Sequence, residues 1–187
     1  MDNLPIESDQ VLAAKDRKRM AALIRYTARS LKTSTPVPFG ALIVNTASGV
    51  VLMRGLNAVA VENDPSAHAE LRTVRKATKK LVRAGAGRSL TGYTMYTTCE
   101  PCPMCMANAL WAGLDRVVYG ATIEDAARHC RQIYVPAEEV ARRSDMACLV
   151  EGPVLREECY SLFTHPKMLK VFEVWASGSR RVEGEQA

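Results

Sequence analysis

The sequence predicts an α/β fold, a three-layer α/β/α sandwich in which helices cover both faces of a five-stranded mixed sheet. Short apolar runs typical of buried strands alternate along the chain with longer segments of helical character. A four-residue turn, 46–49, joins the first two expected strands, so we expect this pair to be antiparallel. The 187 residues, 48% of them hydrophobic, can build one domain with a core that needs no disulfide bonds.

The first half of the chain is expected to form a helix, a hairpin and a second helix. Ser8 and Asp9 can cap the first helix, and the proline-containing segment 34–38 ends it. A polar loop, 62–66, leads into the second helix. The helices and strands expected in this half cover residues 9–31, 41–44, 50–56 and 68–85.

The second half is expected to add three strands and three helices. Pro103 suits the first position of a helix, because its missing N–H would have no partner there. The expected strands are 94–98, 117–119 and 146–150, and the expected helices are 103–111, 154–163 and 165–175. We expect one domain over residues 10–178, between a flexible N-terminus (1–9) and a flexible tail (179–187).

Cysteine usage and hydropathy indicate the compartment. Residues 1–10 lack the apolar run of a signal peptide, and no stretch approaches the roughly 18 apolar residues of a membrane span. We therefore expect a cytoplasmic protein without a membrane partner. Three of the six cysteines fall close together at 99–105, and in a reducing compartment such a cluster favours metal ligands over disulfides.

The net charge of +5 is concentrated in two basic runs. The residues are Lys15, Arg17, Lys18, Arg19, Arg25, Arg29 and Lys32 in the first run, and Arg72, Arg75, Lys76, Lys79, Lys80, Arg83 and Arg88 in the second. Solvated helix faces are the favoured interpretation. The alternative is an electrostatic surface for nucleic acid or for a phosphorylated substrate.

One motif carries the chemistry of the chain. His68, Cys102 and Cys105 offer a tetrahedral Zn²⁺ three ligands and leave its fourth position to water, as in catalytic rather than structural zinc sites. Cys102 and Cys105 lie three residues apart at a helix start, so their side chains can share one face. Glu70, at i+2 from the histidine, is expected to carry protons for the bound water or hydroxide. We expect one Zn²⁺ per subunit.

The cysteine run suggests two alternatives to a catalytic zinc. Cys99 extends the cysteine run and leaves a structural zinc with four protein ligands open. An iron–sulfur cluster of the bacterial type would need a cysteine where the chain has Ala109, so that interpretation fails.

His-Ala-Glu at 68–70 followed by Pro-Cys-x-x-Cys at 101–105 resembles the signature of the cytidine deaminase-like superfamily. The resemblance covers about residues 10–163 and implies the cytidine deaminase-like fold, a catalytic zinc and a homodimer. Within the superfamily, the chain is most similar to the guanine deaminase branch, and the tRNA adenosine deaminases come next. The segments that carry this similarity are 38–41, Asn57, 63–70 and 98–105, with Phe39, Cys99 and Trp111 at positions typical of the guanine branch.

The chain departs from the guanine branch at two places. Guanine deaminases carry an acidic run after the fourth strand, where this chain has 129–133, and the nearest acids upstream are Glu124 and Asp125. The tail also lacks the terminal aromatic residue of the bacterial guanine enzymes. The class of reaction is unaffected, but guanine itself is left open.

The resemblance implies hydrolytic deamination, with Glu70 as the catalytic residue. The substrate contacts that it suggests are Asn57, Phe39, the backbone N–H of Ala69, and Trp111. Plainer roles stay open for three of them, because Phe39 also suits the hairpin core, Asn57 a turn and Trp111 ordinary packing.

Four functions remain. The leading one is deamination of a small aminated heterocycle, a purine base or nucleoside with guanine as the best candidate. The others are adenosine-to-inosine editing of tRNA, deamination of cytosine or isocytosine, and a structural zinc module in a binding protein.

Overall fold

The computed structural model describes residues 9–178. Residues 1–8 and 179–187, where the sequence predicts flexible ends, lie outside this range, and the first helix begins at Asp9. No helix in the described range is long and apolar enough to cross a membrane.

The chain forms five strands and eight α-helices within residues 9–178, with a short 3₁₀ helix, η1, at Arg29–Lys32. The strands are β1 (Gly40–Asn45), β2 (Val51–Leu56), β3 (Tyr93–Cys99), β4 (Arg116–Ala121) and β5 (Leu149–Glu151). The helices are α1 (Asp9–Ala28), α2 (Val59–Glu62), α3 (Ala69–Arg83), α4 (Pro103–Trp111), α5 (Ile123–Ala127), α6 (Ala137–Arg142), α7 (Arg156–Tyr160) and α8 (Pro166–Gly178).

The strands form one mixed sheet in the order β2-β1-β3-β4-β5. β1 pairs antiparallel with both β2 and β3, whereas β3–β4 and β4–β5 are parallel. Because β2 and β3 are each antiparallel to β1, they run in the same direction. Their carboxyl ends therefore lie at one edge of the sheet, where Leu56 pairs with Gly40 and Thr97 with Ala41.

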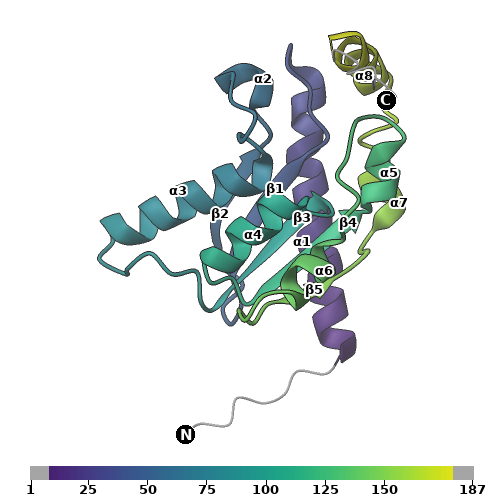
Figure 1. The fold of residues 1–187 in the computed structure, drawn as a ribbon. Coiled ribbons are helices and arrows are strands. Elements are labelled where there is room, and N and C mark those ends of the chain that lie inside the picture. Colours follow the sequence, from purple (N-terminus) through teal and green to yellow (C-terminus); the bar gives the residue numbers. More distant parts are fainter. Residues whose placement is uncertain (1–8, 179–187) are drawn as a thin grey trace, which may run out of the picture.

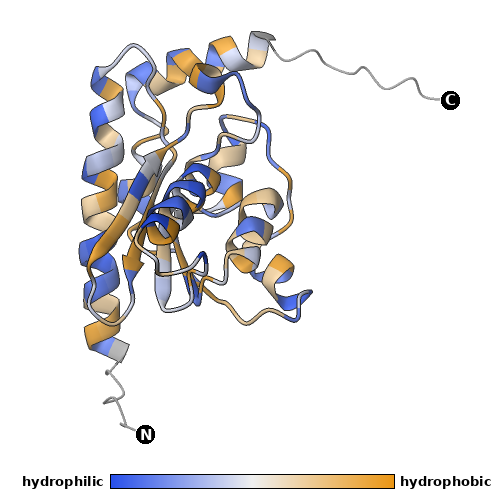
Figure 2. Cartoon of the chain, turned by 90° about the vertical axis from the view of Figure 1, so that its left-hand side faces the viewer, coloured by the Kyte–Doolittle hydropathy of each residue, from blue (hydrophilic) through white to orange (hydrophobic). Residues whose placement is uncertain are grey.

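Helices cover both faces of this sheet, which confirms the three-layer arrangement (Figure 1). α1 packs on β1 and β3 and α7 on β4, while α3 packs on β1 and β2 from the other side. In Figure 2, α1 is the long helix that follows the N-terminal trace, and hydrophilic and hydrophobic residues alternate along it. The strands supply both cores with period two: Leu42, Tyr96 and Val118 face α1, and Ile43, Met95 and Val117 face α3 and α4.

The predicted hairpin, the two long helices and the metal-motif helix are confirmed, and the errors lie in short elements. Three helices without a predicted counterpart, α2, α5 and α6, have six residues or fewer each. The fifth strand begins later than predicted, at Leu149–Glu151 instead of 146–150. α5 had a readable signal, because Thr122 and Asp125 form a capping box at its start.

Gly55 brings α3 close to the sheet. A Cβ atom at this position would lie 2.3 Å from Thr73 Oγ1 and 3.2 Å from the carbonyl oxygen of Ala69. The Thr73 hydroxyl in turn donates to that carbonyl at 2.6 Å. The missing side chain thus lets the first turn of α3 rest directly on β2.

Gly55→Ala is expected to lower the free energy of unfolding by about 1–3 kcal/mol, because the added methyl group overlaps Thr73. In a Thr73→Ala background the overlapping oxygen is absent, so the same alanine should cost less. Urea unfolding of the wild type, both single variants and the double variant measures this coupling. Strictly additive effects of the two substitutions would contradict the close contact.

Candidate metal centre and active site

The three predicted metal ligands meet at the starts of two helices. His68 directly precedes α3, Cys102 directly precedes α4, and Cys105 lies in the first turn of α4. His68 Nδ1 is 3.7 Å from Cys102 Sγ and 3.4 Å from Cys105 Sγ, and all three ligand atoms lie within 4.8 Å of one another. They meet because α3 follows β2 and α4 follows β3, and these strands end at the same edge of the sheet.

The geometry of these atoms fits zinc. Tetrahedral bonds of about 2.0–2.1 Å to nitrogen and about 2.3 Å to sulfur place the nitrogen about 3.6 Å from each sulfur. The observed separations of 3.7 and 3.4 Å bracket that value. One imidazole and two thiol groups are also the donors that zinc prefers.

The electrostatics of the cluster favour a thiolate. Hydrogen bonds from Cys105 and His68 lower the pKa of Cys102 to about 4, against the opposing effect of burial. The same contact with Cys102 raises the pKa of His68 above its usual value. A thiolate is the form of cysteine that binds metal, so Cys102 is suited to be a zinc ligand.

Glu70 is buried beside the three ligands. Its side chain lies in the first turn of α3 and the residue is only 6% exposed. The Thr97 hydroxyl donates to Glu70 Oε1 at 3.2 Å, and burial raises the pKa of the carboxyl group above its usual value. A raised pKa makes the carboxyl group hold a proton more readily, which suits a residue that must both accept and donate one.

Thr97 is a site residue that the sequence patterns did not predict, although the alternation of side chains along the strand places it on the face of the metal centre. Met95 faces the core below α3 and α4, so Thr97, two residues further along β3, points to the same side. A threonine on that face at the end of a buried strand is a polar residue in need of a partner. Its hydroxyl finds two acceptors, the carbonyl oxygen of Cys99 at 3.0 Å and Glu70 Oε1 at 3.2 Å.

Cys99 lies apart from the cluster. Its thiol contacts the carbonyl oxygen of Thr122 at 3.7 Å, and its side chain belongs to the core on the α1 side of the sheet. Burial raises the pKa of this thiol well above its usual value, which disfavours the thiolate. Within residues 9–178, only His68, Cys102 and Cys105 come together as a group that could hold a metal, so the fourth-ligand interpretation finds no support.

The structure shows packing or turn roles for two predicted substrate contacts. The Phe39 ring meets Phe163 edge to face, with ring centroids 5.2 Å apart. Asn57 is half-buried, and its Oδ1 accepts the backbone N–H of Val59 at 3.1 Å. Their roles as substrate contacts stay predictions.

The other two predicted contacts lie on the helices that carry the ligands. Ala69 is fully buried at the first position of α3, where the helix offers no carbonyl acceptor for its N–H. Trp111, the last residue of α4, is 80% exposed in the single chain. Both substrate contacts stay predictions.

The two acids near the divergent segment 129–133 lie in different surroundings. Asp125 is buried, caps α5 and accepts two hydrogen bonds from Arg156 at 2.7 and 2.9 Å. Glu124 is exposed on the same helix. His129, within the divergent segment, contacts the Tyr160 hydroxyl at 3.0 Å and stacks on Phe172.

Comparison with known proteins agrees with this fold and site. The family described as the cytidine and deoxycytidylate deaminase zinc-binding region matches residues 13–121. Guanine deaminase of Bacillus subtilis (strain 168) is 41% identical over 109 residues, which cover 54% of this chain and 66% of that protein, just under two thirds of its length. The tRNA-specific adenosine deaminase of the same organism is 34% identical over 132 residues, covering 71% of this chain and 76% of that protein.

Solved structures show the same fold. Guanine deaminase from Nitrosomonas europaea superposes with a TM-score of 0.69 at 20% sequence identity, covering 93% of this chain and 98% of that one. The α/β sandwich and its histidine–cysteine cluster define a zinc-binding protein of the deaminase class. The chain belongs to the cytidine and deoxycytidylate deaminase zinc-binding family.

Cys105→Ala is expected to reduce the zinc content from one ion per chain to well below one, because a two-ligand site cannot hold the metal through dialysis. Cys99→Ala is the matched control and is expected to keep its zinc. Metal analysis of dialysed protein measures both. Loss of zinc from the Cys99 variant would instead favour a structural zinc with Cys99 as its fourth ligand.

Proposed function

We propose that this protein is a zinc-dependent hydrolytic deaminase. It replaces an exocyclic amine of a heterocycle by a carbonyl group and releases ammonia. The observation that carries the proposal is the cluster of His68, Cys102 and Cys105, with ligand atoms within 4.8 Å, beside the buried Glu70. Membership of a deaminase zinc-binding family supports the same reaction.

The proposed roles follow from the geometry of the site. His68, Cys102 and Cys105 hold the metal. Bound zinc supplies an activated water at neutral pH. Glu70 would take one proton from the attacking water and deliver it to the ring nitrogen. It would then pass the second proton, from the hydroxyl left on the attacked carbon, to the leaving amine, for which its raised pKa suits it. The Thr97 hydroxyl fixes one oxygen of Glu70, so the other oxygen can face the reacting atoms.

Binding of a flat heterocycle is assigned to residues around this cluster. The N–H of Ala69, which α3 leaves without an internal acceptor, is proposed to donate to a carbonyl or ring nitrogen of the substrate. Phe39 is proposed to stack on the ring, and Asn57 to bind its edge or the ribose. Trp111 is proposed to contribute from the end of α4.

The proposed substrate is a purine base or nucleoside, with guanine first. The support is the 41% identity to a guanine deaminase across 109 residues. Editing of adenosine in tRNA is the second candidate, because Arg75, Lys79 and Arg83 are exposed along α3, the helix that begins at His68. Similarity to a tRNA-specific adenosine deaminase supports this candidate too.

The zinc-loaded protein is expected to release ammonia from guanine within a panel that also holds guanosine, adenine, adenosine, cytosine and isocytosine. Glu70→Gln should keep its zinc and lose activity by about 10²–10⁴-fold, because the proton carrier is gone. The matched control is Glu62→Gln, which changes an exposed carboxylate paired with Arg72 and should keep wild-type rates.

The outcomes of this assay separate the candidates. Ammonia release from cytosine or isocytosine alone would show that the substrate is a pyrimidine and not guanine. Silence across the panel, with inosine formed in an anticodon stem-loop, would favour the tRNA editor, whose binding should weaken steeply with salt. Substantial activity of a zinc-replete Glu70→Gln protein would overturn the role of Glu70.

We also propose a cytoplasmic homodimer that pairs through α4. Trp111 is 80% exposed and Met104 39% exposed on this helix, and large apolar side chains in solvent favour a protein partner. Sedimentation equilibrium is expected to give twice the mass of one chain.

Trp111→Ser is expected to shift this equilibrium toward the monomer, because it removes the largest exposed apolar side chain of α4. Val174→Ser, which changes an exposed apolar residue on α8, is the matched control and should leave the equilibrium unchanged. A monomeric wild type would refute the pairing.

A further inference from the structure

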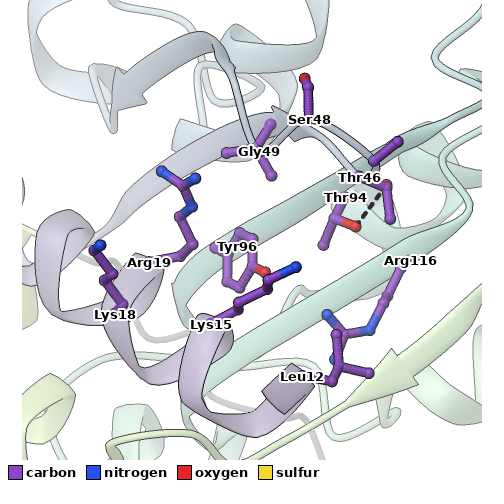
Figure 3. Close-up of a pocket in the computed structure, with 12 residues that line it drawn as sticks. Leu12, Lys15, Lys18, Arg19, Thr46, Ser48, Gly49, Thr94, Tyr96 and Arg116 are labelled. Atoms are coloured by element: carbon purple, nitrogen blue, oxygen red, sulfur yellow. Dashed lines mark hydrogen bonds between the residues drawn. The ribbon is translucent and has the colours of Figure 1, made fainter. Parts of the chain in front are cut away.

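A cavity lies at the edge of the sheet opposite the metal centre. It has a volume of about 230 Å³ and is bounded by the first half of α1, the turn that joins β1 to β2, and the start of β3 (Figure 3). Thr94 and Tyr96 line it near the amino end of β3, whereas the ligand-bearing segment follows the carboxyl end of that strand. The cavity is therefore separate from the metal centre.

Cationic side chains of α1 line one wall of this cavity. Lys15, Lys18 and Arg19 lie at i, i+3 and i+4 and so share one face of the helix (Figure 3). Arg19 is half-buried and Lys18 is exposed. Neither Lys18 nor Arg19 forms a salt bridge with any residue of the described range, so both charges are available to an anion.

A buried network fixes the base of the cavity. The guanidinium of Arg116 donates to both oxygens of Asp16, at 2.8 and 2.6 Å, and its Nε donates to Glu151. The Tyr96 hydroxyl donates to the same Asp16 carboxylate at 2.6 Å. Both acids are thus engaged by Arg116.

The hairpin turn completes the opposite wall. Gly49 adopts a φ of +67°, and a Cβ atom there would lie 2.5 Å from Nη2 of Arg19. A glycine in this turn thereby lets the guanidinium come close to the turn backbone. The hydroxyl groups of this turn are held within it: Thr46 is hydrogen-bonded to Thr94 at 2.9 Å (Figure 3), and Ser48 donates to Asn45 Oδ1 at 2.9 Å.

The rest of the lining is apolar. Leu12, Val44, Ala47 and the ring of Tyr96 contribute it. A purely charged recess would select a bare inorganic ion, whereas cations beside an apolar wall suit an oxyanion attached to an organic body. The volume is below the roughly 300–1,000 Å³ of typical ligand sites, so the ligand is small.

We propose that this cavity binds a small organic anion, with its phosphate or carboxylate group on Arg19 and Lys18 and its apolar body against Leu12 and Val44. Arginine and lysine both bind such oxyanions through charge-assisted hydrogen bonds. This binding site is independent of the proposed deaminase chemistry.

Calorimetric titration of the full-length, zinc-loaded protein with phenyl phosphate tests the proposal. Phenyl phosphate is expected to bind, and so is benzoate, which tests a carboxylate in place of the phosphate. Inorganic phosphate lacks the apolar body and phenol lacks the anionic group, so both should bind more weakly. Arg19→Gln is expected to weaken phenyl phosphate by about tenfold, as for the loss of one charge-assisted hydrogen bond. Lys18→Gln, at an exposed position where misfolding is no concern, should weaken it in the same direction.

Arg17→Gln is the matched control, because it removes an exposed cation of the same helix that does not line the cavity. It should change the affinity by less than about twofold, since distant exposed charges are screened. Amide NMR shifts on titration should centre on Thr46 and Gly49. Absence of binding, equal weakening by the Arg17 and Arg19 variants, or shifts centred on His68 would each overturn the proposal.

Discussion

The metal centre depends on one constraint, which is that α3 and α4 must begin at the same point of the sheet. β1 satisfies this constraint because it pairs antiparallel with a neighbour on each side. β2 and β3 therefore run in one direction and end at one edge. The close contact of Gly55 with α3 then sets how near that helix comes. Three ligand atoms from two segments 34 or more residues apart thereby lie within 4.8 Å of one another.

The burial of Glu70 at this point is energetically unfavourable, and neighbouring groups compensate for part of that cost. A carboxylate in a low-dielectric environment is destabilised, which is why the pKa of Glu70 is raised. The hydrogen bond from Thr97 satisfies part of its need for donors. The charge of His68 opposes the rise in the pKa of Glu70, and His68 and the two cysteines come from the same two helix starts. The chemistry and the electrostatic compensation therefore share one origin in the topology.

Local patterns predicted most of the fold and the ligand cluster. His68, Cys102 and Cys105 could be found because zinc imposes a spacing that survives in the sequence, and the strands because their residues form short apolar runs or alternate in hydrophobicity. The rest depends on contacts between distant segments. The edge-to-face contact of Phe39 with Phe163 joins residues that no local pattern relates, and the short β5 was misplaced because only its pairing with β4 defines it. Short helices such as α6 gain their stability from packing, so periodicity carries little signal over six residues.

The pairing of Asp16 with Arg116 bears on how the chain folds as it leaves the ribosome. The two residues are 100 positions apart, so at about 5–20 residues per second the aspartate emerges roughly 5–20 s before its counter-charge. During that interval α1 can form its own hydrogen bonds, but sealing Asp16 against the sheet would bury an unpaired carboxylate. We therefore expect the first helix to dock late, with the apolar α1-facing surface of the nascent hairpin exposed until β4 has been synthesised.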